Sequence, residues 1–372
     1  MKKNRALTVS LIAVAVGFLL GMVVVLITGR NPINMIFALV KSMTGVDMSR
    51  SGWPFNIVFV FNWLVECMPL ILTGLSVAFA YRTGLFNIGA EGQYMIGSTV
   101  ASFVALYITA PHFPHVFLCV IAAMIAGAIW GAIPGILKAT RNIHEVVICI
   151  MMNYIAWHLS NYLVRYWMPI DKNTNQRSIG FPSTASIDKV LNSITSQFNW
   201  GFILVIIAVI VFWFIIEKTA FGYSLKATGF NKDAAEFAGM KVKRNIVLSM
   251  AISGALSGLA GAVVVLGIFH YGRIFLAFDN YGFNGIPVAL VGAATAPGVA
   301  LAGMLFGLLK ACSNSFQVFN IPKEISELIQ AAIIFLVAIQ YGITTVLDRF
   351  KKHREEEKPA INEEETNHAK AD

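Results

Sequence analysis

The chain has 372 residues, of which 57% are hydrophobic and only 13% are charged, whereas a soluble domain carries about 25% charged residues. Its formal net charge of +8 comes from basic residues in short segments between long apolar runs, a pattern that argues against nucleic-acid binding. The apolar runs are continuous rather than alternating, so we expect an all-α polytopic membrane protein, not a soluble domain or a membrane barrel.

About ten transmembrane helices are predicted. Crossing the hydrocarbon takes about 20 residues, and the eighth and ninth apolar segments are shorter than that. Ala296–Gly298 separates these two segments, which are predicted to be two short helices that meet at a break, or a re-entrant pair. The first apolar run follows Lys2, Lys3 and Arg5 but is too long for a signal peptide, so an uncleaved first helix is expected. The segments are Leu7–Thr28, Phe55–Tyr81, Asn87–Ile108, His115–Leu137, Val146–Met168, Gly201–Ile216, Ile246–His270, Phe283–Thr295, Gly298–Ser313 and Ile325–Leu347.

The positions of the basic residues predict that both termini lie in the cytoplasm, because cytoplasmic loops of membrane proteins are rich in Lys and Arg. Residues 1–347 are then a transmembrane domain with an external loop at 169–200 and a cytoplasmic loop at 219–245. Residues 348–372 are predicted to be a charged, disordered tail. A short surface helix is expected from Pro32 to Lys41.

Two Gly/Ala-rich stretches, Ala126–Gly131 and Ala302–Gly307, resemble each other. They fall in the fourth and ninth predicted segments, which run in opposite directions across the membrane. An inverted repeat of five helices would produce this relation. Chance similarity between Gly/Ala-rich helices is the alternative.

The first polar interruption of the apolar runs is Gly84–Gln93. Asn87 is predicted to cap a helix that starts there, and Glu91 in its first turn suits the helix dipole. Polar groups inside a membrane are usually functional, but a capped, tightly packed helix is the alternative here. Amides and aromatic rings together suit a planar, polar, mostly uncharged solute. The candidate residues of a substrate path are Glu66, Asn87, Glu91, Gln93, Tyr94, Asn153 and Asn284.

The second polar interruption is residues 227–239. Two helical turns are predicted, with Asn231 or Thr228 as the N-cap and Gly239 as the stop. Small residues and Phe237 favour docking into a groove of a partner protein over the alternative, an amphipathic surface helix. The predicted coupling residues are Gly229, Asp233, Ala234, Ala235 and Gly239.

No catalytic, metal or cofactor site is expected. The chain lacks the Gly-rich Lys loop that binds nucleotide phosphates, and its seven histidines lack the spacing of metal ligands. All four cysteines fall in apolar segments, so they are predicted to pack as free thiols rather than to form disulfides. These cysteines are Cys67, Cys119, Cys149 and Cys312.

Several stretches together resemble the permease subunits of bacterial ABC importers for branched-chain amino acids, simple sugars and nucleosides. Pro69–Phe79 running into Gly84–Gln93 looks like the nucleoside branch, which depends on a lipoprotein of the BMP type. The other matching stretches are the coupling pattern Gly229, Ala234, Ala235 and Gly239, then Ser253–Ala262, and Gly282–Gly292.

This resemblance implies the fold of a type II ABC importer in the bacterial plasma membrane. It implies two permease chains, expected here to form a heterodimer, around one pathway. Separate cytoplasmic ATPases would use the ATP and bind the coupling helix, and an external substrate-binding lipoprotein would deliver the solute. The chain itself is then no enzyme, and its membrane lipid contacts are those of a multi-pass protein.

The expected function is translocation of nucleosides by alternating access, driven by the partner ATPases. One alternative is the same machine for a simple sugar such as ribose. A second alternative, an ion-coupled secondary transporter, is disfavoured because the chain lacks paired, deeply buried acidic residues that could relay protons. A third, a membrane scaffold without transport, leaves the Gly-broken segments and the coupling pattern without a use.

Overall fold

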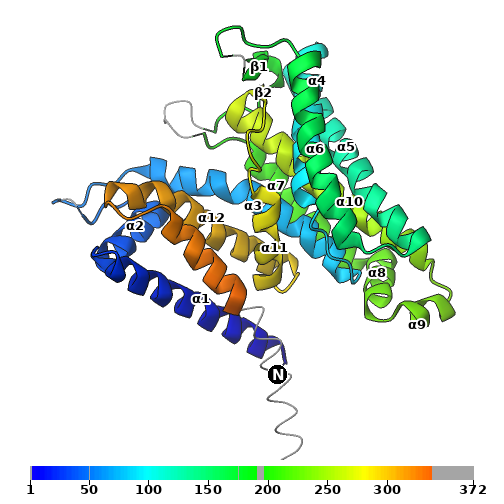
Figure 1. The fold of residues 1–372 in the computed structure, drawn as a ribbon, viewed down its shortest axis with the longest axis horizontal. Helices are drawn as coiled ribbons and strands as arrows, with labels where there is room; N and C mark the ends of the chain where they lie inside the picture. Colours follow the sequence, from blue (N-terminus) through cyan, green and yellow to red (C-terminus); the bar gives the residue numbers. More distant parts are fainter. Residues whose placement is uncertain (1, 50, 175, 191–196, 337–372) are drawn as a thin grey trace, which may run out of the picture.

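The computed structural model describes residues 2–49, 51–174, 176–190 and 197–336, and the predicted tail at 348–372 lies outside them. The fold is all-α, as predicted, apart from one small two-stranded sheet (Figure 1). Each of the first nine predicted segments coincides with a helix, and a helix at 324–336 covers the described part of the tenth. The helices are α1 (Lys2–Ile27), α2 (Pro32–Thr44), α3 (Ile57–Arg82), α4 (Ala90–Tyr107), α5 (His112–Arg141), α6 (Glu145–Trp167), η1 (Ser183–Ala185), α7 (Gly201–Lys218), α8 (Ala220–Phe230), α9 (Lys232–Phe237), α10 (Val242–Val264), η2 (Val265–Phe269), α11 (Tyr281–Val291) and α12 (Ala296–Val318); the strands are β1 (Arg177–Gly180) and β2 (Tyr271–Arg273).

Six of the described helices are long and apolar enough to cross a membrane, namely α3, α5, α6, α7, α10 with its continuation η2, and α12. The break predicted at Ala296–Gly298 lies instead at residues 292–295, and Pro297 occupies the first turn of α12. Proline is tolerated in a first helical turn, where the missing N–H has no partner to lose. The ninth segment is therefore a full-length helix of 23 residues, so the prediction of two short helices is wrong. Of the two helices at this break, only α11, with 11 residues, is short.

Helix α10 is the most enclosed of the spanning helices, and it packs closely along α5. Gly127 of α5 lies against Gly254 and Gly258 of α10, and a methyl group added at any of the three would collide with backbone atoms of the other helix. Such small residues let two helix backbones approach closely inside a membrane, where packing replaces the hydrophobic effect.

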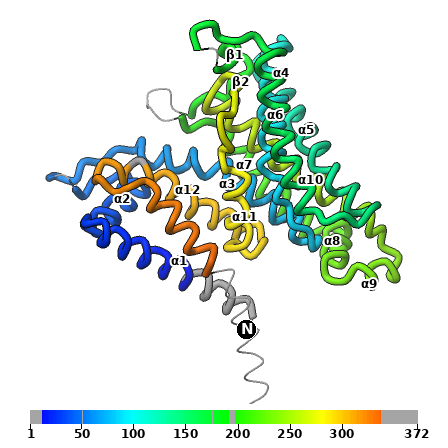
Figure 2. Tube along the Cα trace, viewed as in Figure 1, coloured from blue at the N-terminus to red at the C-terminus, as the bar shows by residue number. Residues whose placement is uncertain are grey.

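Figure 2 shows the helices in two groups, with α1, α2, α3 and α12 on one side and α4, α5, α6 and α10 on the other. Helix α3 joins the groups, because it packs on α12 and also on α10. The short helix α11 lies between them, in contact with α3, α12 and α4. Helices α8 and α9 lie at one end of α10, and β1 and β2 lie at its other end (Figure 1).

The predicted external loop at 169–200 contains β1 and η1. Strand β1 pairs antiparallel with β2, with Arg177 opposite Arg273, and η1 packs on α5. The backbone N–H of Asn173 and the side chain of Arg177 hold the pKa of Asp171 below its usual value by hydrogen bonding to its carboxylate. Through the pairing of β1 with β2, the predicted external loop is joined directly to the segment that follows α10.

Residues between α1 and α3 also fold back onto the helices. The surface helix predicted from Pro32 to Lys41 is confirmed as α2, and the Asn31 side chain caps it by accepting from the N–H of Ile33. Helix α2 packs on α12 and α3. At its end, Lys41 and Asp47 form an enclosed ion pair at 2.8 Å.

Candidate functional site

The polar stretch between α3 and α4 turns inward. Helix α4 begins at Ala90, and its N-cap is Gly89, which makes no side-chain cap hydrogen bond. The predicted capping role of Asn87 is therefore wrong. The Asn87 Nδ2 instead donates to Gln93 Oε1 at 2.8 Å and to Ser253 Oγ at 2.6 Å, and Gln93 Nε2 donates back to Asn87 Oδ1 at 3.1 Å. Both amides are buried, and the partners that the fold brings to the Asn87 side chain explain why it does not cap the helix.

Buried hydroxyl groups continue this network between α3 and α10. The Oγ of Ser253 donates to the backbone oxygen of Ser76 at 2.6 Å, and Ser257 Oγ donates to Ser76 Oγ at 2.8 Å. Closer to the end of α3, Thr83 Oγ1 donates to Ser249 Oγ at 2.8 Å. Asn87 and Gln93 thus join α3, α4 and α10, which is the packing role that we considered as the alternative to solute contact.

Glu91 binds the start of another helix. Its carboxylate accepts from the backbone N–H of Asn280 at 2.9 Å and from that of Gly282 at 2.6 Å. These donors lie at the beginning of α11, where free N–H groups and the helix dipole favour a negative charge. The sequence predicted this electrostatic role, but for the helix that carries Glu91 itself.

Tyr94 lies one turn further along α4, beside a charged pair. Its Oη donates to Asp279 Oδ2 at 2.9 Å. Arg273 binds the same carboxylate through both of its terminal nitrogens, at 2.6 and 3.0 Å, and its guanidinium stacks 3.9 Å from the centre of the Phe269 ring. Sequence reasoning missed Arg273 and Asp279. Two opposite charges six residues apart, between two apolar segments, were the available signal.

A second cluster of polar and charged side chains surrounds Glu66 of α3, beside the cluster of Tyr94, Asp279 and Arg273. Its Oε2 lies 3.3 Å from Lys310 Nζ and accepts from Tyr281 Oη at 3.2 Å. Lys310 Nζ also lies 3.4 Å from the centre of the Tyr281 ring, and this ring lies 5.5 Å from the ring of Tyr94. The two clusters therefore meet through a pair of tyrosines at the start of α11.

The two remaining candidate path residues differ. Asn153 of α6 fixes the loop before α4, because its Oδ1 accepts from Gly92 N at 2.9 Å and its Nδ2 donates to the Ile88 oxygen at 3.0 Å. Asn284 is half-buried, and its side chain makes no hydrogen bond to any residue that the structure describes. The seven candidates thus converge around α4 and α11, but most of them act as ties between elements rather than as the lining of one cavity.

These ties give a first testable expectation. Replacing Glu91 with alanine leaves the N–H groups of Asn280 and Gly282 without their acceptor, and an unsatisfied buried donor costs about 1–3 kcal/mol. We expect a clearly lower midpoint of thermal unfolding for the purified protein in detergent. Asn284→Ala is the matched control and should leave the midpoint near that of the wild type. Equal midpoints for the two variants would contradict the capping role of Glu91.

The predicted coupling segment forms two short helices. Asn231 ends α8 and caps α9, accepting from Ala234 N at 3.0 Å, and Gly239 adopts a left-handed φ of 80° just after α9. Of the predicted coupling residues here, Asp233, Ala234 and Gly239 are exposed, whereas only 4% of Ala235 is exposed. Among the large hydrophobic side chains that the structure describes, the two most exposed are Phe230 at 97% and Phe237 at 94%. Phe230 was missed by the sequence reasoning, because it ends the helix preceding the predicted one.

Gly229 brings the two polar stretches of the sequence into contact. A Cβ atom at Gly229 would lie 2.6 Å from the oxygen of Arg82 and 2.8 Å from Gly84 N, so only glycine fits there without displacing the backbone. Gly84 itself has φ 73°, a left-handed conformation that favours glycine. The end of α8 therefore rests directly on the turn that leads from α3 into the Asn87 network.

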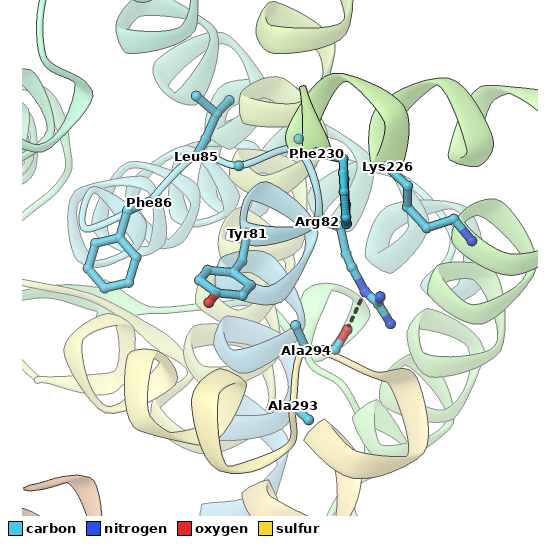
Figure 3. Close-up of a pocket in the computed structure, with 10 residues that line it drawn as sticks. Tyr81, Arg82, Leu85, Phe86, Lys226, Phe230, Ala293 and Ala294 are labelled. Atoms are coloured by element: carbon cyan, nitrogen blue, oxygen red, sulfur yellow. Dashed lines mark hydrogen bonds between the residues drawn. The ribbon is translucent and has the colours of Figure 1, made fainter. Parts of the chain in front are cut away.

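A cavity of about 610 Å³ opens beside this contact (Figure 3). It lies between the end of α3, the end of α8 and the turn between α11 and α12. Arg82 crosses it, donating from Nε to the oxygen of Ala294 at 2.9 Å, and also pairs with Glu217 at 3.4 Å. Lys226 of α8 pairs with the same Glu217 at 3.0 Å. The turn at Ala294 is thus tied to α3 and, through Glu217, to α8.

Comparison with known proteins gives one family. The model of the branched-chain amino acid transport system permease component matches residues 59–338. The guanosine ABC transporter permease protein NupP of Bacillus subtilis is 40% identical over 355 residues, which cover 95% of this chain and 99% of that protein. The nucleoside ABC transporter permease protein NupB of Lactococcus lactis is 36% identical, covering 94% and 95%. The glucose ABC transporter permease protein TsgB13 of Haloferax volcanii is 32% identical, covering 78% and 77%.

Proposed function

Because the chain belongs to the family of branched-chain amino acid transport system permease components, we propose that it forms the membrane path of an ATP-driven importer for nucleosides. As a permease component it is a multi-pass membrane protein and not itself an enzyme. The observation that carries the nucleoside assignment is the near-full-length similarity, at 40% and 36% identity, to permease proteins named for guanosine and nucleoside transport. Because each match covers nearly the whole chain, it includes α4, α11 and the helices that pack on them.

The proposed assembly has several partners. Membership of the family implies an ATPase and a substrate-binding component. We further propose a second, different permease subunit, an external lipoprotein that delivers the nucleoside, and both termini in the cytoplasm. In this orientation α8 and α9 face the ATPase, whereas β1, η1 and β2 lie at the opposite, external end of α10.

The contacts support a route for alternating access. A push on α9 moves α8, and Gly229 at the end of α8 presses on the turn at Gly84. That turn leads into the Asn87 network and the start of α4, whose Glu91 holds the start of α11. Movement at the ATPase surface would thereby reach α11 near the middle of the bundle.

Uptake measurements test the function. Cells that lack other nucleoside carriers but carry the whole transporter should take up labelled guanosine, and unlabelled nucleosides should compete whereas ribose and glucose should not. Uptake should stop when ATP is depleted. Competition by the sugars alone would favour the sugar alternative, which the similarity to the glucose permease protein supports. Uptake that survives ATP depletion but collapses with the ion gradient would instead indicate a secondary transporter.

A further inference from the structure

A second cavity, of about 490 Å³, lies between α2, α3 and α12. Gln197, just before α7, and Ile268 of η2 also line it. Both belong to the end of the molecule opposite α8 and α9, because η2 continues the far end of α10. The cavity therefore opens toward the side that we assign to the exterior.

Among the α3 residues that line this cavity, Glu66 lies furthest from the start of the helix. This residue is nine positions into α3, which places it roughly 14 Å along the helix, near the middle of a hydrocarbon layer about 30 Å thick. Its Oε2 is held by Lys310 and Tyr281, whereas its Oε1 makes no hydrogen bond within the described residues. One carboxylate oxygen is therefore left to accept hydrogen bonds from a molecule in the cavity.

The charges around the cavity are paired. Lys41 lines the cavity, but its Nζ is bound to Asp47 at 2.8 Å, and Lys310, which is not a lining residue, is bound to Glu66 at 3.3 Å. The Lys41–Asp47 pair is buried, so breaking it would leave an uncompensated buried charge, whereas the Lys310–Glu66 pair is partly exposed. Among the residues that the structure describes, no unpaired cation lines the cavity to receive a phosphate or carboxylate.

The remaining lining offers neutral groups. Gln197 Oε1 is buried and has no hydrogen-bond partner within the described part of the chain, and the hydroxyls of Ser42 and Ser315 face each other at 3.4 Å. Phe59 and Val65 supply apolar surface. A site of this kind, mostly apolar with a few placed polar groups, is typical of a small-molecule site and has room for one.

We infer that this cavity is a binding site for the uncharged nucleoside on its way in, with Glu66 Oε1 accepting hydrogen bonds from donor groups of the ribose or base. The inference rests on the proposed function, and it names the residues that recognise that solute. A carboxylate accepts from ribose hydroxyls in dinucleotide-binding proteins, which shows that the chemistry suits a nucleoside. Because both cations are already paired, the described lining offers no free positive charge to the phosphate of a nucleoside monophosphate.

The position of Glu66 also explains how occupancy would be sensed. The carboxylate is bonded to Tyr281, the first residue of α11, and the Tyr281 ring lies against Tyr94. A solute that binds Glu66 therefore acts on the same start of α11 that Glu91 holds from the other side. The proposed solute site and the proposed route from α8 therefore both lead to the start of α11.

Uptake kinetics in the complete transporter test the site. Glu66→Gln keeps the shape but replaces the charged acceptor, and Ala311→Phe fills the cavity from α12. A hydrogen bond to a charged group is worth enough to change an affinity by about tenfold or more. We expect KM for guanosine to rise at least about tenfold in both variants, with Vmax within about twofold of the wild type after correction for the amount of protein in the membrane. Guanosine 5′-monophosphate should not compete in the wild type.

Leu301→Phe is the matched control, because it also adds a ring on α12 but at a position 66% exposed and outside the cavity. Its KM should equal that of the wild type. A wild-type KM in both Glu66→Gln and Ala311→Phe, or competition by the monophosphate, would overturn the inference while leaving the proposed function intact. A wild-type transporter that takes up no nucleoside would instead overturn the proposed function, and the inference with it.

Discussion

Gly229→Val is expected to reduce nucleoside uptake strongly while the protein still inserts into the membrane. The end of α8 rests on the turn after α3, where a Cβ at this position would lie 2.6 Å from the Arg82 oxygen. The atoms that this Cβ would meet, the Arg82 oxygen and the Gly84 nitrogen, both belong to the backbone, so neither can move away by rotating a side chain. The valine must push α8 away from the Gly84 turn, and this contact is the one through which we propose that movement reaches α4.

The size of the effect follows from the contact. Overpacking a tight site costs about 1–3 kcal/mol, and each 1.4 kcal/mol corresponds to about tenfold in an equilibrium. Because the strain falls on the coupling route, we expect uptake to drop at least about tenfold, with the KM for solute little changed. ATP hydrolysis by the assembled transporter should continue without responding to solute.

Ala220→Val provides the control for this experiment. Ala220 is the exposed first residue of the same helix, so the added bulk meets solvent or a partner rather than the α3 turn. Its uptake should stay within about twofold of the wild type, as for most exposed substitutions. Normal uptake by Gly229→Val would show that the contact between α8 and the Gly84 turn does not transmit movement.

The sequence predicts the helices well for a physical reason. A chain in hydrocarbon must satisfy its own backbone hydrogen bonds, so long apolar runs have one available structure. Local signals were also sufficient for the cap of α9, where Asn231 bonds to a residue three positions away. The described part of the chain thus confirms the all-α architecture, whereas the inverted repeat stays a prediction.

Long-range partners are where the local reasoning fails. Asn87 was expected to cap its own helix, but Ser253, far along the chain, offers its amide a partner inside the protein. Glu91 was paired with the wrong helix terminus, because the start of α11 is brought to it only by the fold. The acidic and basic partners Asp279 and Lys310 were missed for the same reason. Charge and polarity are visible in a sequence, but the group that each one meets depends on the packing.

The side chains that the coupling segment exposes to a partner are not all the ones that the sequence predicted. Ala235 is one of the predicted coupling residues, yet it faces inward and is only 4% exposed. Bulk at that position would displace α9 itself, so a loss of uptake there would not identify a surface. Phe230 and Phe237 are exposed on α8 and α9 and are the side chains that a partner groove would take up.

The double variant Phe230→Ala, Phe237→Ala is therefore expected to separate the permease from its ATPase. Truncating a buried aromatic anchor at an interface costs about 2 kcal/mol or more, so the ATPase should bind roughly 30-fold more weakly or worse. Co-purification should fall and uptake should be lost, while the thermal unfolding of the isolated permease should not change, because neither ring packs inside the protein.

Phe113→Ala is the matched control, since this ring is 80% exposed at the start of α5, at the end of the molecule opposite α9. It should co-purify with the ATPase as the wild type does. If the double variant retained both the ATPase and uptake, α8 and α9 would not be the docking surface. The ATPase would then have no contact through which to move the proposed route from Gly229 to Glu91. Co-purification without uptake would instead mean that the two rings transmit the push rather than supply the affinity.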